Sequence, residues 1–261
     1  MKKFWALSAL LLSALPLPAA IVEKTVDYEH EGVKLEGFHA YDDGIDGKRP
    51  SVLIIHQWTG LTDYEKMRAR ILAEAGYNVF AADIYGAGVR PLPPAAGEEA
   101  GKYKQDRALF RGRLLAGLEV LKKDERTDED NIAAIGYCFG GTGVLELARA
   151  GAPIAGVASF HGGLAPAQGM EAAEGYIPAR VLVLHGAVDP HVPPAEVQAF
   201  QEEMSQAKAD WQLIIYGDAV HGFTQKSAGE DISKGVAYDK QADERSWEHL
   251  HGFFEEIFSN S

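Results

Sequence analysis

The chain has 261 residues, an apolar fraction of 46% and a formal net charge of −13. This length suits one large α/β domain, and the apolar fraction is enough for a filled core, which excludes an intrinsically disordered chain. The acidic balance argues against a nucleic-acid or anionic-membrane partner, because phosphate binding requires clustered Lys and Arg.

The first twenty residues differ in composition from the rest. Lys2 and Lys3 precede an almost wholly apolar run over residues 4–15, and the segment ends on small residues at Ala20. This order is typical of a secretory signal peptide, whereas a membrane span needs about 20 apolar residues. We therefore predict a signal peptide over residues 1–20 and one domain over residues 21–261. The expected location is periplasmic or secreted, with no stable membrane association once the signal is removed.

The domain is predicted to begin with two strands. Residues 22–41 alternate polar and apolar side chains around His30-Glu31-Gly32, which predicts an antiparallel β-hairpin. A turn-rich connector over residues 42–50 follows.

From residue 51 onward, predicted strands and helices alternate. A continuous apolar run indicates a buried strand over residues 51–56. Further strands are predicted over residues 77–84, 132–137, 154–160, 181–185 and 211–216. Helices are predicted over residues 62–75, with Thr62 as N-cap and Glu65 completing a capping box, and over residues 102–123, 140–150, 194–207 and 240–258. The segment 85–101 is rich in Gly and Pro and is predicted to be a loop. The alternation predicts a mainly parallel twisted sheet with helices on both faces, and functional sites lie at the carboxyl ends of such strands.

A candidate nucleophile stands between one of these strands and the next helix. Residues 136–141 read Gly-Tyr-Cys-Phe-Gly-Gly, with Cys138, the one cysteine of the chain, at the centre. The pattern G-x-nucleophile-x-G is typical of a turn so tight that its flanks accept small residues only, and the following helix N-terminus favours a thiolate. The alternative is a buried structural cysteine. A dinucleotide-binding loop would need a different glycine register, G-x-G-x-x-G.

Two further residues complete a hydrolytic triad. Asp189 follows the strand 181–185 and His221 follows the strand 211–216, so the chain order is nucleophile, acid, histidine. His221 is the predicted base that takes the thiol proton, and Asp189 is predicted to orient its imidazole. Each residue alone is also compatible with an ordinary turn; their joint order after successive strands favours the triad.

Backbone N–H groups are expected to stabilise the oxyanion. The residue after the nucleophile, Phe139, supplies one, and Trp58, in the loop after the first buried strand, supplies the other. The aromatic and polar side chains expected to contact the substrate are Gln57, Tyr85, Phe160 and Phe223.

The remaining histidines are given no role in this hypothesis. They include His56, His161, His185, His191, His249 and His251. Their positions relative to acidic residues show no metal-ligand spacing, so we predict neither a metal nor a cofactor.

With these motifs in place, the sequence resembles the dienelactone hydrolase family of α/β-hydrolases. The resemblance extends from residue 22 to residue 258 and rests on five segments: residues 56–61, 82–86, 136–141, 185–189 and 221–223. It implies an α/β-hydrolase fold and hydrolysis of a small-molecule ester or lactone. It also implies Cys138, Asp189 and His221 as the triad and an acyl-thioester intermediate.

The chain departs from the family pattern near the expected pocket. Well-known members carry Glu at the position of Gln57 and bind a substrate carboxylate with two arginines. In this chain Arg90 lies further along the sequence than the first of those two arginines. Thr224 and Gln225 occupy the region of the second arginine. The resemblance therefore implies an ester or lactone substrate without implying a carboxylate on it.

Two other classes of function compete with hydrolysis. The first is a redox protein that cycles its lone thiol, although the chain has no second cysteine to resolve an oxidised one. The second is a non-catalytic binding protein on a hydrolase scaffold, although all three triad positions are filled.

Overall fold

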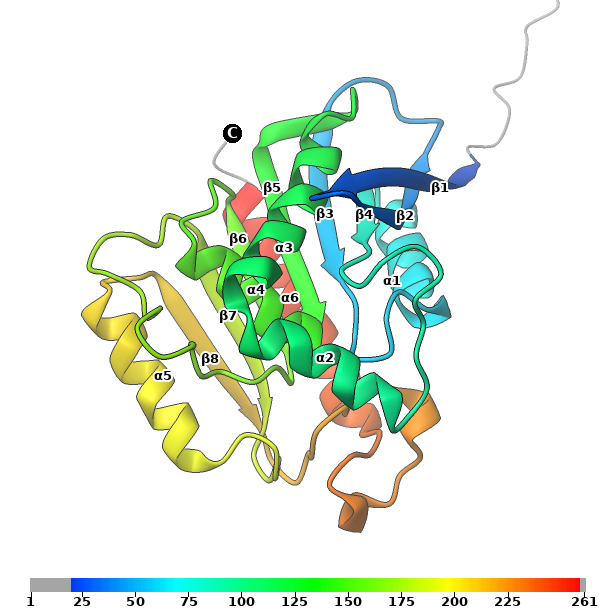
Figure 1. Ribbon diagram of the computed structural model, residues 1–261. Coiled ribbons are helices and arrows are strands. Elements are labelled where there is room, and N and C mark those ends of the chain that lie inside the picture. The colour runs from blue at the N-terminus through cyan, green and yellow to red at the C-terminus, as the bar shows by residue number, and fades with distance from the viewer. Residues whose placement is uncertain (1–19, 259–261) are drawn as a thin grey trace, which may run out of the picture.

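The computed structural model describes residues 20–258. Apart from Ala20, the predicted signal peptide lies outside the described residues. The described part forms one sheet flanked by helices (Figure 1).

The sheet has eight strands within residues 20–258, in the order β1-β2-β4-β3-β5-β6-β7-β8. The strands β1 and β2 pair antiparallel, β2 pairs antiparallel with β4, and all other neighbours are parallel. Their bounds are β1 Ile21–His30, β2 Val33–Asp42, β3 Arg49–Ile55, β4 Asn78–Ala82, β5 Thr127–Tyr137, β6 Gly156–Phe160, β7 Arg180–Gly186 and β8 Trp211–Tyr216. The predicted hairpin and the mainly parallel α/β-hydrolase sheet are thus confirmed.

Helices cover both faces of this sheet. Their bounds are α1 Asp63–Glu74, α2 Ala95–Gln105, α3 Arg107–Lys122, α4 Phe139–Arg149, α5 Pro194–Gln206 and α6 Lys240–Phe258. Helices α3, α4 and α5 pack on one face, and α1 and α6 pack on the other (Figure 1).

The layered packing follows from the two-residue period of the strands. In β3, Leu53 and Ile55 belong to the cluster beneath α3 and α4, whereas Val52 and Ile54 belong to the cluster beneath α1 and α6. A strand between two helical layers must be apolar at every position, which is why its sequence is a continuous apolar run. A continuous apolar run therefore excludes an edge strand that has one solvent-exposed face.

Local signals also fixed the ends of several elements. Helix α1 begins after Thr62, whose side chain accepts from the Tyr64 N–H, while the Glu65 carboxylate accepts from the Thr62 N–H, as the predicted capping box requires. The hairpin turns at Glu31 and Gly32, both with positive φ.

Two predictions between residues 85 and 123 are wrong. The segment 85–101 is not wholly a loop, because α2 begins at Ala95. The predicted helix 102–123 is not continuous, because it divides at Asp106, whose carboxylate accepts from the Leu109 N–H and caps α3. A preceding run of Pro and Gly concealed the first start, and an acidic residue inside a helical pattern concealed the second. In addition, β5 begins at Thr127, where it pairs with Arg49 ahead of the apolar run.

Helix α2 crosses the edge of the sheet to which the carboxyl ends of the parallel strands point (Figure 1). Within residues 20–258, no helix combines the length and the apolar character that crossing a bilayer requires.

Candidate active site

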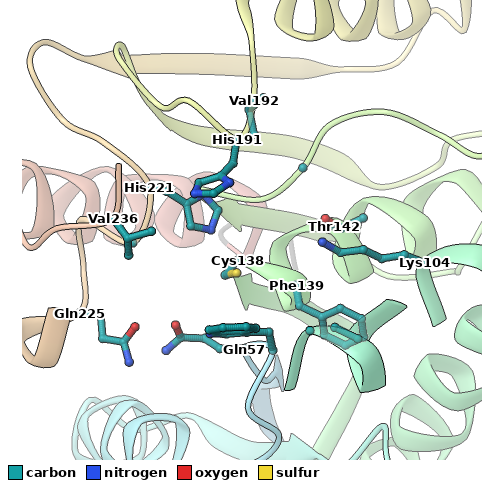
Figure 2. Close-up of a pocket in the computed structure, with 15 residues that line it drawn as sticks. Gln57, Lys104, Cys138, Phe139, Thr142, His191, Val192, His221, Gln225 and Val236 are labelled. Carbon is teal, nitrogen blue, oxygen red and sulfur yellow. The ribbon is translucent and has the colours of Figure 1, made fainter. Parts of the chain in front are cut away.

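Three polar side chains meet at the carboxyl edge of the sheet. Cys138 follows β5, Asp189 lies three residues beyond β7, and His221 lies five residues beyond β8. Parallel strands bring these loops to the same edge, so residues distant in the sequence become neighbours. Figure 2 shows Cys138 and His221 facing one hollow, with Gln57 on the opposite side of the sulfur from His221.

The backbone at Cys138 has the sharp turn that the sequence predicts. Its φ is 54° and its ψ is −113°, a conformation that L residues rarely adopt. A Cβ at Gly136 would lie 2.0 Å from the Gly140 carbonyl oxygen, and a Cβ at Gly140 would lie 2.1 Å from the Ile55 oxygen. Both glycines are therefore required by backbone contact, and the turn lifts Cys138 to the start of α4.

Asp189 and His221 form the second half of the arrangement. The Nδ1 atom of His221 lies 2.9 Å from Asp189 Oδ2, and the other carboxylate oxygen accepts from the His191 N–H at 2.8 Å. The carboxylate is buried, so this pair of bonds holds it in one orientation. With Nδ1 engaged, the Nε2 edge of His221 is the one that faces the sulfur, with which the ring forms a hydrogen bond.

The electrostatics favour a charged pair. Burial alone would raise the pKa of the Cys138 thiol, but the positive charge of His221 and its hydrogen bond lower that pKa below its ordinary value. Burial opposes protonation of His221, but the Cys138 thiolate and the Asp189 carboxylate together raise its pKa to about 10. Burial alone would raise the pKa of Asp189, but the hydrogen bond and positive charge of His221, together with the bond from the His191 N–H, lower that pKa below its ordinary value. Thiolate and imidazolium therefore stabilise each other.

Donor groups surround the sulfur and the space beside it. The Phe139 N–H, at the N-terminus of α4, donates to Cys138. The Gln57 carbonyl accepts from His56 Nδ1 at 2.6 Å and from the Gly60 N–H at 3.1 Å. In a trans peptide the N–H points opposite to the carbonyl, so the Trp58 N–H is directed away from His56 and Gly60.

The loop that carries Trp58 is held at further points. The Gln57 N–H donates to the buried carboxylate of Glu65 at 3.1 Å, and the Tyr85 hydroxyl donates to the Trp58 carbonyl at 3.0 Å. These bonds anchor the peptide units on both sides of the Trp58 N–H, which gives the loop one conformation before any ligand arrives.

A cavity of about 280 Å³ opens above the sulfur. It is lined by Gln57, Trp58, Gly97, Ala100, Lys104, Cys138, Phe139, Thr142, Gly163, His191, Val192, His221, Gly222, Gln225 and Val236. Cys138 and His221 face this cavity, with Lys104 of α2 on another side of it (Figure 2). Gly97 and Ala100 of α2 also line the cavity.

The predicted substrate-contacting residues separate into two groups. Gln57 lines the cavity. Tyr85, Phe160 and Phe223 do not; each is a buried side chain of the core. Tyr85 holds the Trp58 carbonyl, Phe160 stacks on Tyr137, and Phe223 packs against His161, so these three support the site from behind.

Three cavity or near-cavity residues have no counterpart in the sequence hypothesis. The rings of His161 and His191 lie 5.3 Å and 5.0 Å from that of His221, and both had been given no role. His161 directly follows β6, so the rule that located Asp189 and His221 would also have found it. Lys104 was missed because α2 was not recognised as an element above the site.

Within residues 20–258, no group of three or more His, Cys, Asp or Glu side chains is arranged to hold a metal ion. The groups at the site are a thiol whose pKa is lowered by His221, an imidazole bonded to a carboxylate, and oriented N–H groups.

A mainly parallel sheet with an antiparallel hairpin, and a sharp Gly-x-Cys-x-Gly turn between a strand and a helix, define the chain as an α/β-hydrolase. A model of the dienelactone hydrolase family matches residues 35–258. The chain therefore belongs to the dienelactone hydrolase family, and it is a hydrolase of carboxylic esters or lactones.

Individual relatives agree with this assignment. The crystal structure of a dienelactone hydrolase-like promiscuous phosphotriesterase from metagenomic libraries is 38% identical, with a TM-score of 0.86 over 91% of this chain and 99% of that one. A putative carboxymethylenebutenolidase of Saccharolobus solfataricus is 26% identical, over 90% of this chain and 99% of its own length. An uncharacterized protein of Caenorhabditis elegans is 37% identical, over 58% of this chain and 95% of its own.

Proposed function

We propose that the protein hydrolyses its ester or lactone through Cys138, His221 and Asp189, with an acyl-thioester intermediate on Cys138. The observation that carries the proposal is the hydrogen-bonded series from the Cys138 sulfur through His221 to the buried Asp189, with Cys138 and His221 lining the cavity. An unreactive structural cysteine would have no need of a strained backbone, an imidazole partner and a cavity together.

The first half of the reaction forms the thioester. The Cys138 thiolate attacks the carbonyl carbon, a C–S bond forms, and the carbonyl electron pair moves to the oxygen. As the tetrahedral intermediate collapses, the C–O bond to the leaving group breaks and imidazolium His221 donates its Nε2 proton to the alkoxide. For a lactone, the alkoxide formed remains part of the acyl group.

The second half consumes water. Neutral His221 accepts a proton from a water molecule, whose oxygen attacks the thioester carbonyl. The C–S bond then breaks, the electron pair returns to sulfur, and the acid leaves. The thiolate and the imidazolium are both restored, so the cycle is balanced for one ester and one water. Asp189 stabilises the charged ring in both halves and keeps Nδ1 protonated.

The oxyanion is assigned to the N–H groups of Phe139 and Trp58. The bond from Phe139 to the sulfur and the anchoring of the Trp58 loop by Glu65 and Tyr85 support this assignment. Donors that are oriented in advance need no reorganisation when charge develops, and loss of one such donor typically costs about 3 kcal/mol of transition-state stabilisation.

The nucleophile is tested by substitution and by trapping. Cys138→Ala is expected to abolish turnover of an aryl ester, and Cys138→Ser to retain little, because an alkoxide is much harder to form than a thiolate with an unchanged base. Rapid quenching followed by mass spectrometry should show wild-type protein heavier by one acyl group. Undiminished turnover in Cys138→Ala, with its fold verified by circular dichroism, would remove Cys138 from the mechanism.

The same experiment separates hydrolysis from the other two classes. A thiol redox protein would show no acyl adduct, and a binding protein would retain the ester unchanged. Both are less consistent with membership of a hydrolase family than the mechanism above.

A second candidate substrate class is the phosphotriester. The observation that favours it is the 38% identity to a structure described as a promiscuous phosphotriesterase. The Cys138 thiolate would form a P–S bond while the P–O bond to the aryloxide breaks and imidazolium His221 supplies a proton to it; water activated by His221 would then break the P–S bond and restore the thiolate. Assaying an aryl phosphotriester beside an aryl ester of the same leaving group compares the two reactions in one chromogenic measurement.

We also propose that the chain is exported after cleavage near Ala20. The basic start and the short apolar run of residues 4–15 support this proposal. N-terminal sequencing of protein from a periplasmic extract tests it, and a mature chain that still begins at Met1 would contradict it.

A further inference from the structure

His161 lies directly behind the nucleophile. It follows the last residue of β6, its side chain is 1% exposed, and its φ is 40°, in the left-handed region. Its Nδ1 atom lies 3.1 Å from the Cys138 backbone nitrogen, which also donates to the Phe160 carbonyl at 3.0 Å. The Cys138 N–H is thus shared between two acceptors, the Phe160 carbonyl oxygen and His161 Nδ1.

The protonation of His161 follows from its neighbours. The Cys138 N–H can only donate, so Nδ1 of His161 must present a lone pair to it. The ring proton is then on Nε2, which lies 2.9 Å from Thr224 Oγ1, and the threonine hydroxyl accepts it. One tautomer satisfies both contacts, and the other places two donors face to face at Cys138.

The threonine is itself held by a buried network. Thr224 Oγ1 lies 2.7 Å from the Tyr64 hydroxyl, which accepts from Arg68 Nε at 3.2 Å. Arg68 forms an ion pair of 2.7 Å with Asp243. The network therefore runs from the nucleophile to α1 and α6, on the face of the sheet opposite α4.

The groups around His161 disfavour a second ring proton. Burial and the positive charge of His221 lower the pKa of His161 well below its ordinary value. The titratable or charged groups that face it are Tyr64, Arg68, Tyr137, His185, His221 and Asp243. Of these, Asp243 is already paired with Arg68, and His221 carries the charge that the thiolate requires.

We propose that His161 is a positioning residue: an imidazole that stays neutral and carries its proton on Nε2, with the Cys138 N–H selecting that state and Thr224 holding the ring in place, and that supports the strained Cys138 turn through the same N–H. This rests on the proposed role of Cys138 as nucleophile. The edge of the His161 ring also meets the His221 ring at 5.3 Å and an interplanar angle of 63°, so the same residue limits how the base can tilt.

Removing the lock has a defined consequence. In Thr224→Val the shape is kept but the acceptor for Nε2–H is gone, so a buried N–H is left without a partner and the His161 ring is no longer held in its position. A displaced ring no longer accepts well from the Cys138 N–H, so the turn shifts. Thr224→Ser is the matched control, because it keeps the hydroxyl and loses one methyl group.

Two measurements test the proposal. Long-range ¹H–¹⁵N spectra of the imidazoles should show His161 as the Nε2–H tautomer, with no titration between about pH 5 and pH 9, around the ordinary histidine pKa of ~6.5. In steady-state assays, kcat of Thr224→Val should fall about tenfold or more with KM little changed, as expected when an interaction specific to the transition state is lost. Thr224→Ser should restore most of kcat. Tyr64→Phe leaves the threonine hydroxyl in place. It should lower the melting temperature while kcat stays close to the wild-type value.

The outcomes are separable. A His161 that titrates in this range, or that carries its proton on Nδ1 in wild type, overturns the proposal, and this spectrum does not depend on any variant folding. Equal kcat in folded Thr224→Val and Thr224→Ser also overturns it. If Cys138→Ala retains full activity, the proposed mechanism fails, but the wild-type tautomer still decides whether His161 is locked.

Discussion

The cavity has two walls of different construction. The inner wall consists of Cys138, Phe139 and His221 at the sheet edge, and the outer wall consists of Gly97, Ala100 and Lys104 on α2. On the inner wall, the Cys138 N–H is bonded to His161 and His221 is bonded to Asp189, whereas Lys104 of the outer wall is exposed.

The difference separates two tasks. A group whose position is fixed in advance can stabilise a transition state, because no energy is lost in orienting it during the reaction. An exposed side chain can adjust to different ligands but contributes less to each. We therefore expect changes in the inner wall to lower kcat strongly and changes in the outer wall to alter KM modestly.

The largest loss of kcat is expected from changes at His221, the proposed base, and at Asp189, which is proposed to orient it. In the proposed mechanism, His221→Ala should lower kcat about as far as Cys138→Ala, because the members of a catalytic triad act as a unit. Asp189→Asn should lower kcat by up to about four orders of magnitude, because an amide can hold the wrong imidazole tautomer. Steady-state kinetics on an aryl ester measure both.

Asp218 provides the matched control for the acid. It is an exposed carboxylate between β8 and His221, with a φ of 62° that asparagine tolerates. Asp218→Asn should leave kcat near the wild-type value. A strong loss there, together with a near-normal Asp189→Asn, would transfer the orienting role to Asp218.

An intermediate effect is expected from the charge at position 57. The pKa of Cys138 is lowered despite burial because His221 is positive, so alkylation by iodoacetamide should already be fast below pH ~8.5, the ordinary thiol value. A carboxylate in Gln57→Glu would oppose the thiolate and move the alkylation profile to higher pH by about one unit. The profile follows the deprotonated fraction, so its midpoint rises with the pKa.

His221→Ala supplies the comparison for this profile. It removes the positive charge, so its alkylation midpoint should also move to higher pH, independently of position 57. If wild type and Gln57→Glu have superimposable profiles while His221→Ala shifts, the residue at position 57 does not control the thiol.

The smallest effect is expected in the outer wall. Lys104 is the cationic side chain of α2 that lines the cavity, so Lys104→Met should raise KM about two- to fivefold for an ester with a carboxylate on its acyl group, as suits an exposed ion pair. KM for the uncharged ester should stay constant. Lys102→Met, on the same helix but paired with Glu99 and outside the cavity, is the control. Equal KM changes for both esters would argue against charge recognition.

The two walls also differ in how well their residues can be predicted from the sequence. Cys138, Asp189 and His221 could be placed because each follows a strand whose apolar run is unmistakable, and parallel strands end at one edge. Glycines at 136 and 140 added a second, independent signal, since both positions exclude a Cβ.

The outer wall could not be placed in this way. Helix α2 has small and charged residues and starts after a Pro-rich segment, so its sequence pattern resembles that of a loop. The contact of Tyr103 with Phe139, which packs this helix above the site, is a tertiary contact that the pattern does not reveal. Tyr85, Phe160 and Phe223 were expected in the pocket for their aromatic character, but side-chain direction depends on tertiary packing that the sequence pattern does not reveal. The buried contact of His161 with the Cys138 N–H is likewise a product of two distant strand ends.

One buried carboxylate joins a helix to the reaction centre. Glu65 accepts from the Thr62 N–H and hydroxyl, which starts α1, and from the Gln57 N–H, which holds the Trp58 loop. Helix ends are the parts of a helix that open first, by local fluctuation rather than global unfolding. Each opening of the first turn of α1 would therefore also release the loop opposite the sulfur, so on warming the enzyme would become intermittently inactive while the sheet beneath it is still intact.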